Sequence, residues 1–100
     1  MGYILSRAAE EDLINILLAG AQQFGFAQAE KYHQLLEKTF HYLAENPYVA
    51  RQRIEMKPPV RVHPVGVHMV LYVRKESDDI FIVRVRHGRE DWMPTDYADS

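Results

Sequence analysis

The spacing of the apolar residues changes at Asn46-Pro47, and this change constrains the fold more than any other feature of the sequence. Before it, apolar side chains recur roughly every three to four residues, the spacing that places them on one face of an α-helix. After it, short runs rich in Val, Ile and Tyr are separated by turn residues, a pattern typical of β-strands. A chain of 100 residues organised in this way is expected to form one α+β domain.

The first half of the chain predicts two helices joined by a short link. Ser6 is a favourable N-cap for the first helix, and Gly25 is a favourable residue to end it. The second helix is expected from about Ala27 to Glu45, because the residue before Pro47 disfavours the helical conformation. The short link implies an antiparallel hairpin. The expected apolar stripes are Ala9, Leu13, Ile16, Leu17 and Phe24 on the first helix, and Ala29, Tyr32, Leu36, Phe40 and Leu43 on the second.

Four apolar runs predict strands. They are Tyr3–Leu5, Val60–His63, Val67–Arg74 and Ile80–His87. Short turn segments separate the last three, which favours antiparallel pairing. We therefore predict an α+β fold of order β-α-α-β-β-β, in which the helical hairpin packs on a four-stranded antiparallel sheet. The domain is expected to span residues 1–100. Within it, residues 90–100 show neither the helical nor the strand spacing of apolar residues, and they are expected to form a mobile tail.

Several classes of protein are excluded by what the sequence lacks. Without cysteine there is no disulfide, no thiolate nucleophile and no Cys-ligated metal. No apolar run reaches the roughly 18 residues that span a membrane, and the N-terminus does not resemble a secretory signal, so a cytoplasmic protein is expected. The five histidines lack metal-binding spacing, and there is no glycine-rich phosphate loop. We expect no metal and no cofactor.

Basic residues are concentrated in the strand-rich part of the chain. The net charge is −2, which argues against direct nucleic-acid binding. Residues 51–89 nevertheless carry nine basic side chains against four acidic ones, and seven of the nine are arginines. Because the arginine fork suits carboxylates and phosphates, this stretch is a candidate for charged contacts with a partner.

The densest polar cluster lies at the end of the last expected strand and has two interpretations. Alternation places Ile80, Ile82, Arg84 and Arg86 on one face of that strand. The two arginines could clamp a phosphate or carboxylate, with His87 as general acid or base. Alternatively, this is an exposed sheet end where the arginines pair with Glu90 and Asp91.

At this cluster the sequence resembles toxins of the RelE/ParE superfamily, on the ParE side. The resemblance covers nearly the whole chain. It rests on the segment Leu5–Leu13, on Leu43-Ala44-Glu45-Asn46-Pro47, on the segment Val65–Tyr72 and above all on the segment Ile82–Asp91. The sequence departs from the family pattern at Ala50, where a glycine often stands, and in its arginine-poor first helix.

The resemblance implies a toxin of a type II toxin–antitoxin system. Its partner would be a ParD-like antitoxin with a ribbon-helix-helix domain and an acidic tail. Its target would be DNA gyrase, bound without covalent chemistry. One alternative is a RelE-like ribosome-dependent mRNA endoribonuclease that uses Arg84, Arg86, His87 and Tyr97. Another is a protein of the toxin fold without toxicity.

The sequence also predicts which residues contact a target or an antitoxin. Apolar anchors next to arginines are typical of protein interfaces. Trp92, the single tryptophan, is expected either to pack back on the sheet or to contact a partner. The predicted contact residues are Arg51, Arg53, Arg61, Ile80, Ile82, Arg84, Arg86, Arg89 and Trp92.

Overall fold

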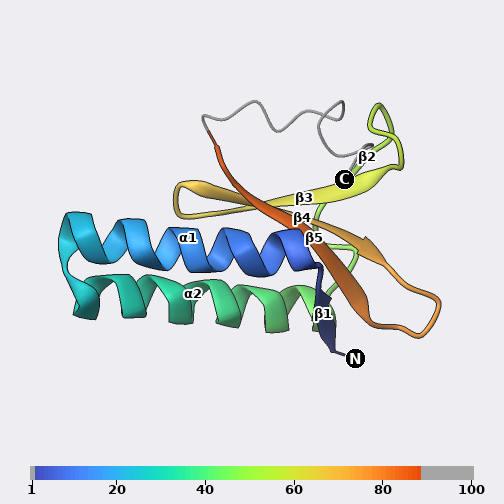
Figure 1. Cartoon of the computed structure of the whole chain (residues 1–100). Helices are drawn as coiled ribbons and strands as arrows, with labels where there is room; N and C mark the ends of the chain where they lie inside the picture. Colours follow the sequence, from blue (N-terminus) through green and yellow to red (C-terminus); the bar gives the residue numbers. More distant parts are fainter. Residues whose placement is uncertain (1, 89–100) are drawn as a thin grey trace.

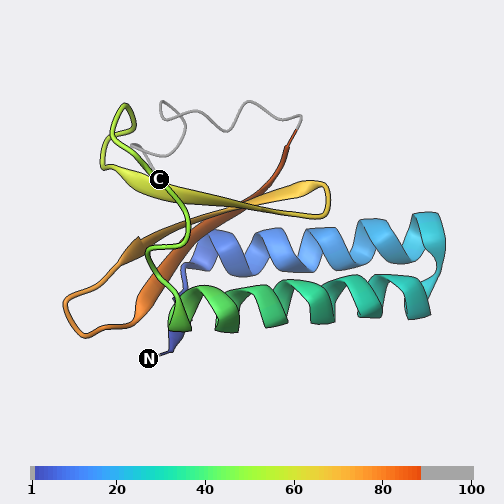
Figure 2. The same ribbon diagram turned by 180° about the vertical axis from the view of Figure 1, so that it is seen from behind.

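Two antiparallel helices pack on one face of a five-stranded sheet in the computed structural model, which describes residues 2–88 (Figure 1). Figure 2 shows the same arrangement from behind, with both helices on the same side of the strands. The α+β class and the helical hairpin are confirmed. The elements in chain order are β1 (Tyr3–Leu5), α1 (Arg7–Phe24), α2 (Phe26–Glu45), β2 (Gln52–Arg53), β3 (Val60–Val65), β4 (His68–Arg74) and β5 (Ile80–His87).

The sheet differs from the prediction in strand number and in the direction of one pair. Its order is β1-β5-β4-β3-β2, and β1 pairs with β5 in parallel, Tyr3 opposite Ile80. An apolar pattern carries no information about strand direction, so it could not reveal this pairing. The fifth strand, β2, has only two residues, which is too short for an alternation to appear. It pairs with the beginning of β3, Arg53 opposite Val60.

Both helices begin and end for the local reasons that the sequence indicates. The Ser6 side chain accepts a hydrogen bond from the Ala9 amide at 2.9 Å and caps α1. Gly25 separates the helices with a φ of 91°, a conformation that favours glycine. Most residues of the two expected apolar stripes are buried or half-buried, but Phe24 is 66% exposed at the last position of α1. The main core lies between helices and sheet and includes Leu13, Leu36, Phe40, Leu43, Val70, Tyr72, Ile80, Ile82 and Val85.

A β-bulge in β5 reverses part of the predicted facing of that strand. Leu71 pairs with Arg84 and Tyr72 with Ile82, which leaves Val83 as an extra residue. Ile82 and Val85 therefore both face the helices. The expectation that Ile80 and Ile82 share an exposed face with Arg84 and Arg86 is wrong, because both isoleucines are 0% exposed in the core. The extra residue shifts the inward and outward alternation of β5, and the residue types of the strand give no sign of this shift.

The other face of the sheet also carries buried apolar residues. Met56, Val60, Val62 and Leu71 form a second cluster there. Met56 comes from the connection between β2 and β3, a segment without apolar periodicity, and is fully buried. Neither helix of the described chain is long and apolar enough to cross a membrane. Residues 89–100 lie outside the described part, and so does the expected mobile tail.

Candidate binding site between helix α1 and strand β5

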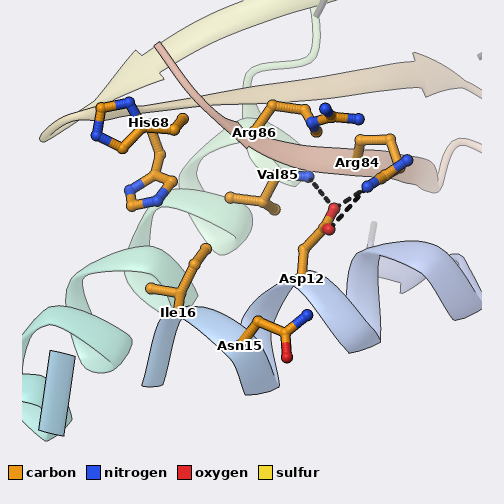
Figure 3. A pocket seen from close by; sticks show the side chains of 8 residues that line it. Asp12, Asn15, Ile16, His68, Arg84, Val85 and Arg86 are labelled. Carbon is orange, nitrogen blue, oxygen red and sulfur yellow. Dashed lines mark hydrogen bonds and ion pairs between the residues drawn. The ribbon is translucent and has the colours of Figure 1, made fainter. Parts of the chain in front are cut away.

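A pocket of about 270 Å³ lies between α1 and the ends of β4 and β5 (Figure 3). Helix α1 supplies one wall through Asp12, Asn15 and Ile16, and the strands supply the other. The strand residues at the pocket are His68 from β4 and Arg84, Val85, Arg86 and His87 from β5. The cluster that the sequence singles out at the end of the last strand thus lines a concave surface.

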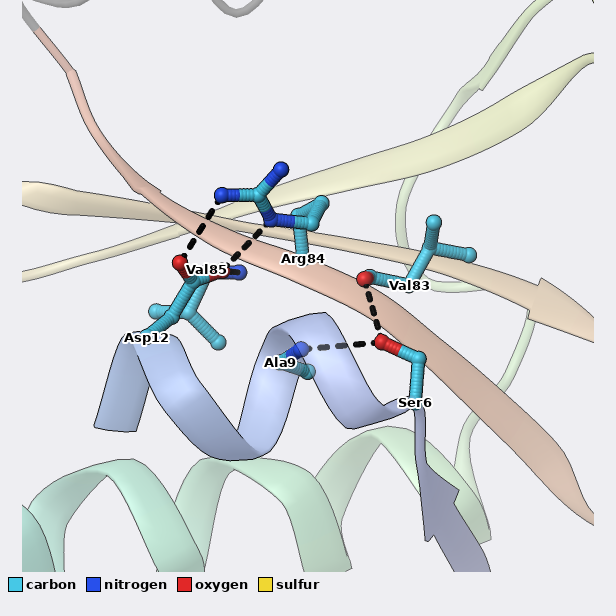
Figure 4. Close-up of polar contacts among 6 residues, drawn as sticks. All are labelled: Ser6, Ala9, Asp12, Val83, Arg84 and Val85. Carbon is cyan, nitrogen blue, oxygen red and sulfur yellow. Dashed lines mark hydrogen bonds and ion pairs between the residues drawn. The ribbon is translucent and has the colours of Figure 1, made fainter. Parts of the chain in front are cut away.

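Asp12 binds β5 through both of its carboxylate oxygens. Oδ2 accepts hydrogen bonds from Arg84 Nε at 2.8 Å and from the Val85 amide at 2.9 Å. Oδ1 accepts a third from Arg84 Nη2 at 2.9 Å (Figures 3 and 4). The two side chains are only 13% and 20% exposed, so this is a largely desolvated, two-pronged ion pair. It fixes the Arg84 guanidinium at the edge of the pocket.

Ser6 makes a second link between α1 and the same strand. Its amide donates to the Ile82 carbonyl at 2.9 Å. Figure 4 shows the second bond, which the Ser6 hydroxyl donates to the Val83 carbonyl at 2.7 Å. Strand β1 pairs with β5 only as far as Ile82. Ser6 and Asp12 therefore satisfy backbone groups of β5 beyond the end of its neighbouring strand.

His68 is held by a tyrosine from α2. The Tyr32 hydroxyl lies 2.6 Å from His68 Nδ1, 3.2 Å from the Val65 carbonyl oxygen, and accepts from the Val67 amide at 3.2 Å. Burial raises the pKa of Tyr32 above its usual value, so the hydroxyl stays neutral. Gly66 permits this close approach, because a Cβ at that position would lie 2.6 Å from the hydroxyl oxygen.

The two histidines of the pocket lie against each other. The His68 and His87 rings meet edge to face, with their centroids 5.4 Å apart, and the two residues are paired across β4 and β5. In the part of the chain that the structure describes, no three His, Asp or Glu side chains are grouped to hold a metal ion. The donors gathered here, two arginines and two imidazoles, suit an anion.

The structure divides the predicted contact residues between two places. Arg84, Arg86 and His87 line the pocket just described. Arg51 and Arg53 line a second, larger hollow of about 550 Å³ at the opposite edge of the sheet. There Arg53 pairs with Glu55 at 3.3 Å.

Arg61 has a structural role. It donates to the Ala50 carbonyl at 2.7 Å, and its guanidinium lies 5.0 Å from the centre of the Tyr48 ring. Arg89, Trp92 and Tyr97 lie outside the described residues, as do Glu90 and Asp91, the expected partners of the arginines.

Sequence reasoning missed four residues of the site. Asp12 and Asn15 are not singled out in the sequence analysis, although an aspartate followed by asparagine three positions later marks one polar helix face. The partners Asp12 and Arg84 are 72 positions apart, and no local pattern connects them. Tyr32 and His68 were assigned to a core stripe and a strand, and only the fold brings them together.

Comparisons with known proteins agree on one family. A family model described as the ParE toxin of type II toxin–antitoxin system, parDE, matches residues 3–92. "Toxin ParE1" of Mycobacterium tuberculosis (strain ATCC 25618 / H37Rv) is 34% identical over 89 residues, which cover 89% of this chain and 91% of that protein. "Toxin ParE" of Escherichia coli is 29% identical over 91 residues, covering 91% and 88% of the two chains.

A solved structure shares the fold. A chain of the "Chromosomal ParDE TA system from P. aeruginosa" superposes with a TM-score of 0.75 at 21% identity and covers 87% of this chain and 95% of that one. At that identity the likeness concerns the fold alone. The α+β arrangement of a helical hairpin on a sheet is therefore found in an experimentally determined protein as well.

Proposed function

The chain belongs to the family of ParE toxins of type II toxin–antitoxin systems, and on this premise we propose that it acts by binding DNA gyrase and is neutralised by a ParD-like antitoxin. The observation that carries the proposal is the family match, which extends from residue 3 to residue 92. The proposed mode of action is non-covalent binding in the cytoplasm, where gyrase works on DNA.

The surface of the helical hairpin supports a protein target. Ile14 and Leu18 are each 57% exposed on α1, one turn apart. Leu35 and Tyr42 on α2 are 44% and 45% exposed. Exposed apolar side chains on the hairpin would gain from being covered by a protein partner.

Charge supports a protein partner over nucleic acid. The chain carries a net charge of −2, and Glu10 and Glu11 are exposed on α1, directly before Asp12 in the sequence. Phosphate backbones would be repelled there. An acidic antitoxin segment that folds on binding could instead place individual carboxylates against the basic residues of 51–88.

Induction of the gene in a bacterial host tests the proposal. We expect growth arrest, which co-expression of the adjacent antitoxin reading frame relieves. The purified protein is expected to inhibit DNA supercoiling by purified gyrase, and addition of the antitoxin is expected to restore it. Growth arrest with normal gyrase activity would contradict the proposed target.

The variant His87→Ala separates this proposal from the ribonuclease alternative. A toxin that only binds should retain its toxicity within a fewfold, because no proton transfer depends on His87. A ribonuclease that uses His87 should lose roughly 10²–10⁴ in rate. Primer extension on ribosome-bound transcripts is the measurement, and site-specific cuts that vanish in the variant would establish the ribonuclease. The melting temperature of the variant controls for loss of the ring contact with His68.

A further inference from the structure

We propose that the hairpin tip, formed by Phe24, Gly25 and Phe26 where α1 meets α2, is the surface that contacts the protein target, and that the target receives it in an uncharged, apolar groove. The inference rests on the proposed function in one respect, namely that the chain acts by binding a protein. It adds which part of the toxin makes this contact. It also separates that part from the basic residues 51–88, where the antitoxin is proposed to bind.

The hairpin tip projects beyond the sheet. Figures 1 and 2 show that the helix ends on either side of Gly25 extend past the turn between β3 and β4. Phe24 is 66% exposed and Phe26 is 64% exposed, so the described chain leaves most of both side chains open to water. A Cβ placed on Gly25 would meet no atom within 4 Å, which shows the same open surroundings. Two phenylalanines on either side of one turn are thus presented to solvent together.

The hairpin tip lies within a segment that carries no charge. Residues 13–29 contain no Asp, Glu, Lys, Arg or His, although 26% of the whole chain is charged. Burial does not explain this, because Gln22, Gln23 and Gln28 are exposed around the tip. The exposed face of a helix in water normally carries charged side chains. An apolar centre with an uncharged polar rim instead has the composition of a protein interface, where aromatic residues are enriched and charges are depleted.

The backbone of the hairpin tip is held in place before any partner binds. The Gly25 amide donates to the Ala21 carbonyl at 3.0 Å, and the Gly25 carbonyl accepts from the Ala29 amide at 3.1 Å. The helices approach each other closely just behind the tip, where a Cβ on Gly20 would lie 3.2 Å from the Ala29 Cβ. Because the backbone is already fixed, little conformational entropy is lost when a partner binds.

The lack of charge distinguishes the target from other kinds of partner. Nucleic acids and membrane surfaces attract basic residues, and residues 13–29 contain none. An acidic antitoxin segment likewise finds no cation at the hairpin tip. A charged groove on the target would lose hydration on contact with the two phenyl rings without gaining a partner for its charge. The matching surface is therefore apolar and uncharged.

The size of the hairpin tip argues against a second copy of the chain as the partner. Aromatic side chains bury roughly 150–250 Å² each, so two rings that are about two-thirds exposed offer roughly 200–300 Å². A stable interface buries about 800 Å² on each partner. Two tips packed against each other fall short of this area. A larger target adds contacts beside the tip, for example with Leu18, which is 57% exposed on α1.

Substitution of both phenylalanines tests the proposal. Phe24→Ser combined with Phe26→Ser changes only exposed side chains, so the melting temperature should stay close to that of the unmodified chain. Growth arrest on induction should be lost. Inhibition of DNA supercoiling by gyrase should weaken by at least about tenfold, because interface anchors are removed. Phe24→Leu combined with Phe26→Leu keeps apolar side chains and should weaken inhibition much less.

Two further variants serve as an independent test and as a matched control. Gln23→Glu combined with Gln28→Glu leaves both rings in place and should weaken inhibition, because the new carboxylates lose hydration at the contact. Val49→Ser removes a side chain that is 48% exposed in the connection after α2, and it should change inhibition less than about twofold. The affinity for the antitoxin, measured by calorimetry, should change less than about twofold in every variant.

Three outcomes would overturn the proposal. The first is equal growth arrest by the double serine variant and the unmodified chain. The second is a loss of antitoxin affinity in that variant, which would place the antitoxin on the hairpin tip. The third is a dimer of the unmodified chain in light scattering that the variant abolishes, which would place a second copy there. If the unmodified chain does not arrest growth, the proposed function itself is wrong. If it arrests growth and the variant does so equally, only the role of the hairpin tip is wrong.

Discussion

At the scale of single residues, Asp12 connects the helical layer to the sheet. Its carboxylate binds both a side chain and a backbone amide of β5, so one residue serves as ion-pair partner and as substitute for a neighbouring strand. Removing it would leave the Arg84 charge and the Val85 amide without this acceptor in a region that is largely closed to water. A buried charge or amide without a hydrogen-bond partner lowers the stability of the fold.

We therefore expect Asp12→Ala to lower the free energy of unfolding by about 2–4 kcal/mol. Chemical denaturation monitored by circular dichroism is the measurement. The matched control is Glu55→Ala, which removes the partner of Arg53 from an ion pair whose side chains are 49% and 40% exposed. Exposed pairs contribute little, so the control should lower the free energy of unfolding much less than Asp12→Ala does. Equal losses in the two variants would contradict the role assigned to Asp12.

At the scale of elements, the first turns of α1 complete the edge of the sheet. Strand β1 covers β5 only to Ile82, and the helix continues that edge through Ser6 and Asp12. The Ser6 hydroxyl has two partners at once, because it accepts from the Ala9 amide and donates to the Val83 carbonyl. A helix cap and a strand contact thus depend on the same atom.

The two contacts of Ser6 can be separated by substitution. Ser6→Ala removes both and should cost about 1–2 kcal/mol of stability. Ser6→Asp keeps a cap acceptor for Ala9 but cannot donate to Val83 at neutral pH. Thermal unfolding of both variants gives the comparison. If Ser6→Asp is as stable as the unmodified chain, the hydrogen bond to Val83 contributes nothing and the helix cap accounts for the whole effect.

The accuracy of sequence reasoning varies between elements for physical reasons. Both helices follow from local signals, since caps, periodicity and the break at Asn46-Pro47 all act within a few residues. The bulge at Val83 is set by pairing with β4, so alternation alone assigned Ile80 and Ile82 to the wrong surroundings. Arg84, Arg86 and His87 are close in the sequence and line one pocket in the structure, whereas the residues packed around them come from α1, α2 and β4 and are distant in the sequence.

At the scale of the whole molecule, the helical layer and the sheet are joined by tyrosines as well as by aliphatic side chains. Tyr72 is fully buried, and its hydroxyl donates to the Pro47 carbonyl at 2.9 Å just after α2. Tyr32 joins α2 to the turn between β3 and β4. The Tyr3 ring packs on Phe40 with centroids 5.3 Å apart. Each of these phenols belongs to the contact between the two layers.

This arrangement predicts that the fold loses stability in alkali. Burial raises the pKa of Tyr3, Tyr32 and Tyr72 above the usual 10.0. Below that pH both the folded and the unfolded chain keep the phenols neutral, and their contribution is fully present. As pH rises past 10, the unfolded chain ionises first, so the free energy of unfolding falls until the folded pKa values are passed.

Denaturation at a series of pH values measures this slope. Tyr72→Phe should reduce it, whereas Tyr48→Phe should not, because the Tyr48 side chain is 64% exposed and lies outside the contact between the two layers. An unchanged slope in Tyr72→Phe would show that the buried phenols do not set the alkaline limit of the fold.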